Sequence, residues 1–478
     1  MRRCLLVLGL VVGYLPWCCA QTLIFEHATV IDATGAPPKK DFTVVVTDGR
    51  IASVGSGAPS IAGAMRIDAT GKFLIPGLWD MHVHVSVPQI AYPLFLANGV
   101  TGVREMYSGI PLATMRQWKM VPDTPRIFAP GFIDGPLMLP GGANWPSAAA
   151  VANPAQARAA VRSLAAQGAD FLKVYNSVPR DAFFALAEEA RAADIPFAGH
   201  VPEEVSPLEA SQAGMRSQEH LNNILLGAST GEGELRAERV AVMKDAKLAG
   251  SQRLQLLAWP LLNGLVDTYS ESKAAALFAA FVKHGTWQTP TLSILYGFAH
   301  QRDQDLAHDP RRRYIPKSWT GVLGPEGMDY LKDLTPGEYE VLRQRMSLLL
   351  ARYMKLVGDM HRAGVGLLAG TDTNPFNPVL PGFGLHQELA LLVDCGLTPM
   401  EALQTATRNP ARYFGKLDEM GTIEVGNVAD LVLLNADPLQ DIHNTEKIAG
   451  VMMRGRYYDR QALDAMLERT AATAAVAQ

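Results

Sequence analysis

Two histidines in a strand-like segment are the first residues of this chain whose type and spacing could do chemistry. His82 and His84 lie two positions apart in the apolar stretch Leu78–Val85. Side chains alternate along a β-strand, so residues i and i+2 point to the same face. Histidine is the commonest metal ligand, and two imidazoles on one face supply half of a metal site. Two surface histidines on an edge strand would show the same spacing, so the pair is informative only together with further ligands.

The segments that must position this pair alternate between strands and amphipathic helices from about Gly77 to Phe414. Eight segments have the apolar, β-branched character of strands. They are Leu78–Val85, Val100–Met106, Arg126–Gly131, Phe171–Tyr175, Pro196–Val201, Arg216–His220, Thr286–Leu292 and Val365–Thr373. Eight β/α units in about 340 residues predict an α/β fold, the (β/α)8 TIM barrel, whose functional groups gather at the C-terminal ends of the strands.

Several helices between these strands carry start and stop signals. Asn153, Ser206 and Thr398 are each followed by a proline and, three residues on, by Gln or Glu. This pattern predicts a helix N-cap with proline in the first turn. Gly168 and Gly214 are placed to end two of the helices before the next strand.

The same strand ends carry further residues that bind metals or protons. Lys173 lies in an otherwise apolar strand, His200 and His220 end the next two strands, and Asp372 follows the last. Each has an ordinary structural explanation, such as a satisfied core histidine or a helix cap before Asn374. If all of these explanations held, such residues would stand at almost every strand end by coincidence. The set therefore predicts a functional cluster.

The two ends of the chain are rich in short strands and turns. Residues 21–75 and residues 416–460 are each too small to bury a core, which predicts that they pair into one small β-sandwich. The barrel is expected over residues 76–415, with helical insertions at about 221–284 and 300–360, and a C-terminal helix or tail over residues 461–478.

The N-terminus has the pattern of a secretory signal. Arg2 and Arg3 precede the apolar run Leu5–Val12, and small residues end at Ala20, so we expect cleavage there and an exported, periplasmic or secreted protein. The 43 Lys and Arg residues fall to 41 without residues 1–20, against 47 acidic residues. A net charge of −6 argues against nucleic-acid binding. No later stretch reaches the ~20 apolar residues of a membrane span, and a homo-oligomer is left open.

This pattern resembles the amidohydrolase superfamily, specifically its binuclear-metal members with a carboxylated lysine, including prolidase-like and imidazolonepropionase-related proteins. The resemblance covers nearly the whole chain after residue 20. It rests on the segments Leu74–His84, Leu172–Tyr175, Gly199–Val201, Glu219–Leu221, Ala369–Thr373 and Gly421–Val432.

The resemblance implies a role for each residue of the cluster. His82 and His84 would bind one divalent ion with Asp372, and His200 and His220 would bind the other. Zinc is the expected metal among several that suit these ligands. A carbon dioxide-derived carbamate on Lys173 would bridge both ions. A hydroxide between the ions would attack the carbonyl of a small-molecule substrate, with Asp372 as general acid and base.

Substrate contacts are expected from three further residues: Tyr175, which shares the face of Lys173, Arg104 at the end of the second strand, and His386 after the last one. Pocket segments around residues 131–145, 288–296 and 376–383 are rich in Pro, Gly and aromatic residues, which predicts a largely apolar pocket. The pattern predicts hydrolysis of an amide-type carbon–nitrogen bond in an N-acyl amino acid, a dipeptide or a cyclic amide.

Two alternatives stay open at this point. The spacing His200-x-x-Glu203 resembles that of mononuclear deaminases, in which one metal suffices and the glutamate moves the proton. A barrel that has lost catalysis and only captures a small periplasmic ligand is a second alternative. Pro202 also stands where lysine-carbamate dipeptidases often carry a tyrosine aimed at the tetrahedral intermediate.

Overall fold

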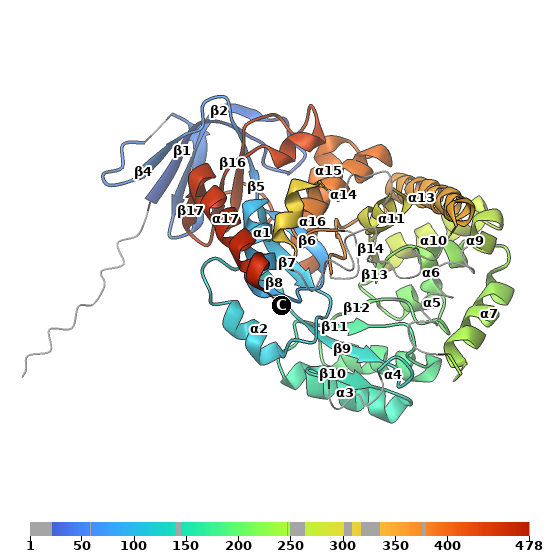
Figure 1. Ribbon diagram of the computed structural model, residues 1–478. Coiled ribbons are helices and arrows are strands. Elements are labelled where there is room, and N and C mark those ends of the chain that lie inside the picture. Colours follow the sequence, from blue (N-terminus) through green and yellow to red (C-terminus); the bar gives the residue numbers. More distant parts are fainter. Residues whose placement is uncertain are drawn as a thin grey trace, which may run out of the picture.

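A computed structural model describes residues 22–57, 59–139, 145–245, 247–248, 263–300, 308–316, 335–374 and 379–477. The predicted signal peptide lies outside these residues, as do parts of both predicted insertions and of two predicted pocket segments. Figure 1 shows a sheet built from the two ends of the chain, blue and red, beside a larger region in which helices surround shorter strands.

Strands from both chain ends form one eight-stranded sheet with the order β17-β16-β15-β5-β1-β2-β3, in which β4 also pairs with β1. The predicted pairing of the two ends is made where β5 runs antiparallel to β15. The strands are β1 (Thr22–Val30), β2 (Lys39–Thr47), β3 (Arg50–Ser56), β4 (Met65–Asp68), β5 (Phe73–Pro76), β15 (Leu431–Leu434), β16 (Ile448–Met453) and β17 (Arg456–Asp459).

This sheet curls back on itself. Phe25 on β1 and Tyr457 on β17 are four strand positions apart, which corresponds to roughly 19 Å in a flat sheet. Their ring centroids nevertheless lie 5.6 Å apart. Leu23 of β1 and Leu431 of β15 belong to the same buried apolar cluster. One core therefore holds both ends of the chain together.

The remaining strands form two parallel sheets. The first has the order β6-β7-β8 and the second β10-β9-β11-β12-β13-β14. Their bounds are β6 (Leu78–Val83), β7 (Val100–Glu105), β8 (Arg126–Phe128), β9 (Pro130–Asp134), β10 (Ala148–Ala150), β11 (Phe171–Val174), β12 (Phe197–Gly199), β13 (Ser217–Glu219) and β14 (Trp287–Thr289). The predicted α/β class with parallel strands is confirmed.

The last two predicted strands need correction. The segment Val365–Thr373 is not a strand and makes two isolated parallel bridges, Leu367 with Gln288 and Thr373 with Val83. These bridges connect it to both parallel sheets. The predicted strand Thr286–Leu292 is shorter than expected, because helix α11 begins at Leu292.

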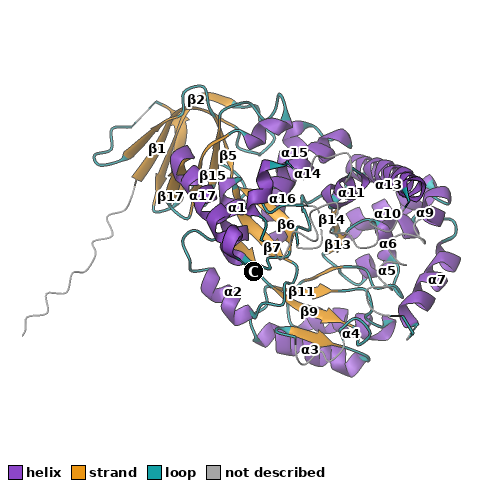
Figure 2. Ribbon diagram, viewed as in Figure 1, coloured by secondary structure: helices purple, strands orange, loops and turns teal. Residues whose placement is uncertain are grey.

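Helices cover the outer side of the parallel strands (Figure 2). They are α1 (Pro88–Ala97), α2 (Leu112–Trp118), α3 (Pro154–Ala166), α4 (Arg180–Ala192), α5 (Pro207–Gln212), α6 (Asn222–Gly227), α7 (Glu232–Lys244), α9 (Asn263–Asp267), α10 (Glu271–His284), α11 (Leu292–Ala299), α13 (Pro336–Arg362), α14 (Phe383–Asp394), α15 (Pro399–Thr405), α16 (Arg408–Phe414) and α17 (Arg460–Val476), with 3-10 helices η3 (Pro310–Tyr314) and η5 (Ile442–Glu446).

The predicted helix starts are confirmed by their hydrogen bonds. Asn153 accepts from the third amide of α3, and Ser206 and Thr398 form complete capping boxes with Glu209 and Glu401. In the described part of the chain, none of the helices combines the length and the apolar character that crossing a bilayer demands.

Candidate metal centre

His82 in β6 and His84 directly after this strand lie against the carboxylate of Asp372. Asp372 Oδ1 is 2.9 Å from His84 Nε2 and 3.3 Å from His82 Nε2. One ligand atom from each of the three residues lies within 4.8 Å of the others, a spacing that suits a shared metal ion. His82 is fully buried, and the side chain of Asp372 is 14% exposed.

The other two predicted histidines continue this cluster. The imidazole centroids of His82 and His220 are 4.8 Å apart, and those of His220 and His200 are 4.7 Å apart. His84 lies at the other end, 5.3 Å from His82. The structure therefore brings together all four predicted imidazoles, from β6 and from the ends of β12 and β13.

All four imidazoles use Nδ1 for a hydrogen bond to the protein. The acceptors are Glu219 Oε2 for His82 (3.0 Å), the Tyr107 carbonyl for His84 (2.6 Å), Asn176 Oδ1 for His200 (2.7 Å) and Thr291 Oγ1 for His220 (2.7 Å). A carboxylate and a carbonyl only accept, so Nδ1 of the first two rings carries the proton. A neutral ring then leaves Nε2 with its lone pair available to a metal.

Lys173 lies on β11 near these rings and is fully buried. Its Nζ has no hydrogen-bond partner among the described atoms, and the same holds for His82 Nε2. Burial lowers the pKa of the Lys173 ammonium group to about 8. At Gly199 of the neighbouring strand β12, a Cβ atom would lie 2.9 Å from Lys173 Cδ. The neutral amine is therefore accessible near neutral pH, and the backbone leaves room for the chain of Lys173.

Left-handed backbone at two ligands turns their side chains toward the cluster. His220 has a φ of 62° and Asp372 a φ of 50°, which are strained values for non-glycine residues. In β13 the alternating side chains Ser217 and Glu219 point to the same side, and the turn at His220 brings its ring there as well. The Asp372 amide donates to the His82 carbonyl at 2.7 Å, which ties the last segment to β6.

The cluster's own electrostatics favour an ionised aspartate and neutral imidazoles at His82, His200 and His220. At His84, burial lowers the pKa of the imidazole, but the hydrogen bond to Asp372 outweighs burial and raises it. Burial, with the nearby charge of Lys173, holds the pKa values of His82 and His200 well below their usual range. Burial opposes ionisation of Asp372, but the charges of His82 and His84 together hold the pKa of that carboxyl well below its usual value. Neutral imidazoles and an ionised carboxylate are the forms that bind metals.

Arg104 does not meet a substrate, contrary to the prediction. Its side chain is fully buried and donates to both oxygens of Glu219, at 2.9 and 2.8 Å. It also donates to Ser217 Oγ, Tyr413 Oη and the Met81 carbonyl. Its charge is therefore paired with Glu219, which also contacts His82 Nδ1, and no surface is left for a ligand.

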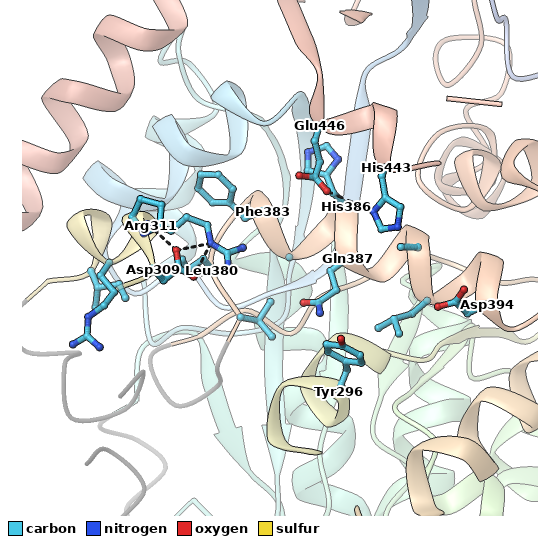
Figure 3. A pocket seen from close by; sticks show the side chains of 17 residues that line it. Tyr296, Asp309, Arg311, Leu380, Phe383, His386, Gln387, Asp394, His443 and Glu446 are labelled. Carbon is cyan, nitrogen blue, oxygen red and sulfur yellow. Dashed lines mark hydrogen bonds and ion pairs between the residues drawn. The ribbon is translucent and has the colours of Figure 1, made fainter. Parts of the chain in front are cut away.

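His386 and Glu203 also need correction. His386 lies on α14 and lines a cavity of about 810 Å³ (Figure 3). Its Nδ1 contacts Thr445 Oγ1 at 2.9 Å, and its Nε2 contacts the Asn98 carbonyl at 3.1 Å. It is 2% exposed and links three segments of the fold. Both oxygens of Glu203 accept from Arg239 at 2.8 Å in a buried ion pair, so Glu203 is not placed as a proton carrier.

Tyr175 does lie at the cluster, as predicted. Its ring centroid is 4.2 Å from that of His200, and the Lys173 Nζ atom is 5.8 Å from the centre of the Tyr175 ring. Phe132 and Tyr107 extend this aromatic row, with stacked rings 4.3 Å apart. One side of the cluster is thus aromatic and apolar.

Sequence reasoning missed the residues that hold the imidazoles. Glu219 could have been found from the sequence, because a charged residue in a buried strand requires a polar or charged partner inside the protein. Asn176 and Thr291 could not have been found in this way, because they lie in connecting segments whose contacts depend on the tertiary structure.

The donor set fits divalent metal ions. Imidazole nitrogen and carboxylate oxygen suit zinc, manganese, cobalt and iron. Among the described residues, the buried atoms His82 Nε2 and Lys173 Nζ have no hydrogen-bond partner, and divalent ions bound here would supply the missing interaction.

A parallel α/β fold with this cluster at its strand ends defines a candidate metalloenzyme. The model of the amidohydrolase family matches residues 73–457, and the chain belongs to this family. The predicted family and the predicted enzyme class, amidohydrolase, are confirmed by this match.

Curated relatives and a solved structure agree with this assignment. An imidazolonepropionase from Cupriavidus necator is 24% identical over 454 residues, 91% of this chain and 94% of that protein. A dihydroorotase from Trichlorobacter lovleyi is 45% identical over 80 residues, only 16% of this chain and 18% of that protein. Bottromycin amidohydrolase is similar in structure with a TM-score of 0.71 and 25% identity, covering 95% of this chain and 91% of that one.

The Nδ1 hydrogen bonds generate a testable prediction at Asn176, which is only partly buried. Asn176→Ala removes the acceptor that orients His200, so we expect the metal affinity of the folded protein to fall about 10- to 100-fold. Titration with zinc against a chromophoric chelator measures this. Asn153→Ala removes an N-cap on the outer helix α3 and serves as the control; equal affinities in the two variants would contradict the orientation argument.

Proposed function

We propose that this protein is a metal-dependent hydrolase that cleaves an amide-type carbon–nitrogen bond in a small molecule. The observation that carries the proposal is the convergence of four imidazoles, each held through Nδ1, on one carboxylate and one buried lysine. The match to an imidazolonepropionase over most of both chains supports the same class of reaction.

Two divalent ions are proposed, with zinc as the first metal to test. His82, His84 and Asp372 would hold one ion, and His200 and His220 the other. Lys173 would hold both through a carbamate, which forms when the neutral amine adds carbon dioxide and releases a proton. The low pKa and the lack of a partner at Lys173 Nζ support this modification.

The chain's own groups then have defined tasks. Bound divalent ions would lower the pKa of a water molecule and polarise a substrate carbonyl. Asp372 is ionised in this environment and can accept the proton of the attacking water. It returns that proton to the leaving nitrogen as the carbonyl carbon gains oxygen and the carbon–nitrogen bond breaks. The aromatic row of Tyr107, Phe132 and Tyr175 keeps one side of the reaction apolar.

We also propose a closed (β/α)8 barrel for the parallel strands and a sandwich for the mixed sheet. The bridges of Leu367 and Thr373, which connect the last segment to both parallel sheets, support closure. The contact between Phe25 and Tyr457 supports two layers in the mixed sheet. On such a barrel, residues at the C-terminal strand ends share one face with the catalytic loops.

Export to the periplasm or the medium is a further proposal, which rests on the N-terminal pattern. Without residues 1–20 the single cysteine is Cys395, which is buried and free. Its pKa is raised to about 12 by burial, so this thiol is inert toward oxidation and suits an oxidising compartment without a disulfide.

Amide substrates and metal removal test the function. We expect the protein to hydrolyse at least one class among N-acyl amino acids, dipeptides and cyclic amides, because an apolar wall borders the cluster. A chelator should abolish the activity and added zinc, manganese or cobalt should restore it. Release of amine, measured on panels of the three classes, reports the result; ammonia release from an aminated ring in place of amide cleavage would favour a deaminase, and metal binding without turnover would favour a binding protein.

Asp372 offers the sharpest test of the mechanism. Asp372→Asn keeps an oxygen ligand but cannot accept a proton, so we expect metal content close to that of the wild type and a fall in kcat of about 10²- to 10⁴-fold. Elemental analysis and steady-state kinetics measure the two effects. Full activity in this variant would contradict the assignment of Asp372 as general acid and base.

A further inference from the structure

Thr291 has an unusual conformation for a β-branched residue. Its φ is 52° and its ψ is 47°, in the left-handed region that such residues rarely adopt. It directly precedes α11, in the N-cap position, but its side chain makes no capping bond to that helix. The hydroxyl instead donates to the Pro290 carbonyl at 2.8 Å and meets His220 Nδ1 at 2.7 Å. Because its single proton is used on Pro290, the oxygen accepts from His220 Nδ1–H.

The carboxylate of Glu388 binds the amides of α11 that Thr291 does not cap. Glu388 lies on α14, is fully buried, and accepts from the Leu292 amide at 3.0 Å and the Ser293 amide at 2.8 Å. Its two oxygens take one amide each, so the first turn of α11 is held at two points. These amides immediately follow Thr291 in the chain, and they fix the direction in which the backbone leaves it.

Several other described helices are capped by a residue of their own, whereas others, such as α4 and α14, have no side-chain cap. Asn153, Ser206, Ser270, Thr335 and Thr398 each accept an amide three positions ahead. A local cap needs no buried charge, whereas a buried carboxylate is a costly group. At α11 the Thr291 hydroxyl contacts His220 instead of the helix, and the distant, fully buried Glu388 binds the first amides in its place.

We propose that Glu388 is a positioning residue for the metal centre, which holds Thr291 in its left-handed conformation and thereby directs His220 Nε2 toward the second metal ion. The inference rests on the proposed function, because it assigns His220 to that ion. Glu388 itself touches neither substrate nor metal. Its influence passes through the two amides, the Thr291 hydroxyl and the Nδ1 hydrogen bond.

Zinc binding to three variants tests this path. Glu388→Gln retains one acceptor oxygen and loses the other, so we expect the second zinc ion to bind about 10- to 100-fold more weakly while the first is unchanged. Thr291→Ala should show the same loss, and Thr291→Ser, which keeps the hydroxyl, should bind like the wild type. Competition with a chromophoric chelator gives both affinities, and circular dichroism shows whether each variant is folded.

The double variant Thr291→Ala/Glu388→Gln decides whether the two residues act in series. If Glu388 acts through Thr291, the second substitution adds little to the first. Thr398→Ala is the matched control, because it removes the cap of α15, which carries no ligand, and should lower Tm without changing either zinc affinity.

The outcomes are distinguishable from a failure of the proposed function. A folded Glu388→Gln protein that has a lower Tm but binds both ions like the wild type would reduce Glu388 to a helix cap and overturn the inference alone. Additive losses in the double variant would also overturn it. If Glu388→Gln does not fold, wild-type affinity in Thr291→Ala refutes the path at its last step. A wild-type protein that binds no zinc would overturn the proposed function together with this inference.

Discussion

An imidazole ring has two nitrogen atoms, and a neutral ring carries one proton. The candidate centre depends on this constraint, because a ring is a ligand only if its proton is held on the other nitrogen. Four different acceptors hold that proton at Nδ1: a carboxylate, a main-chain carbonyl, an amide and a hydroxyl. Their chemistry differs, but the outcome at Nε2 is the same. The surrounding structure is organised to keep these acceptors in place.

Glu219, Asn176 and the ligand Asp372 are each held by further buried contacts. Arg104 forms a buried ion pair with Glu219, so the two charges balance each other inside the fold without solvent. Asp134 accepts from the amide and hydroxyl of Ser177, the residue after Asn176. Asp80 accepts from the amide and hydroxyl of Thr371, next to Asp372. The rigidity of the centre thus comes from buried carboxylates that themselves face no metal.

Features that depend on residue type and on the local spacing of a strand or helix could be predicted from the sequence. The spacing of His82 and His84 followed from strand alternation, and the cap residues Asn153, Ser206 and Thr398 followed from local hydrogen bonding, so both could be predicted from neighbours along the chain. The pairing of the two chain ends followed from the small size of each end. These features depend on short-range geometry or on a simple requirement for burial.

Long-range partners could not be predicted in the same way. Arg104 was assigned to a substrate because a charge at a strand end is usually exposed to the site, but its partner Glu219 lies 115 positions away. His386 and Glu203 were likewise paired by distant residues, Thr445 and Arg239. Neighbouring residues of a strand normally point to opposite sides, but the left-handed backbone at His220 turns its ring to the side of Glu219. No local sequence pattern predicts this turn. Polar residues of this kind need the tertiary structure to show whether they face a ligand or another side chain.

In the proposed centre, Lys173 joins two metal ions in one site. The most direct measurement is the metal stoichiometry of the purified protein and of Lys173→Ala, both produced with bicarbonate and zinc, by elemental analysis. We expect two ions per chain in the wild type, falling to one or none in the variant. One ion per chain that is unaffected by the substitution would contradict the bridged centre and favour a mononuclear site.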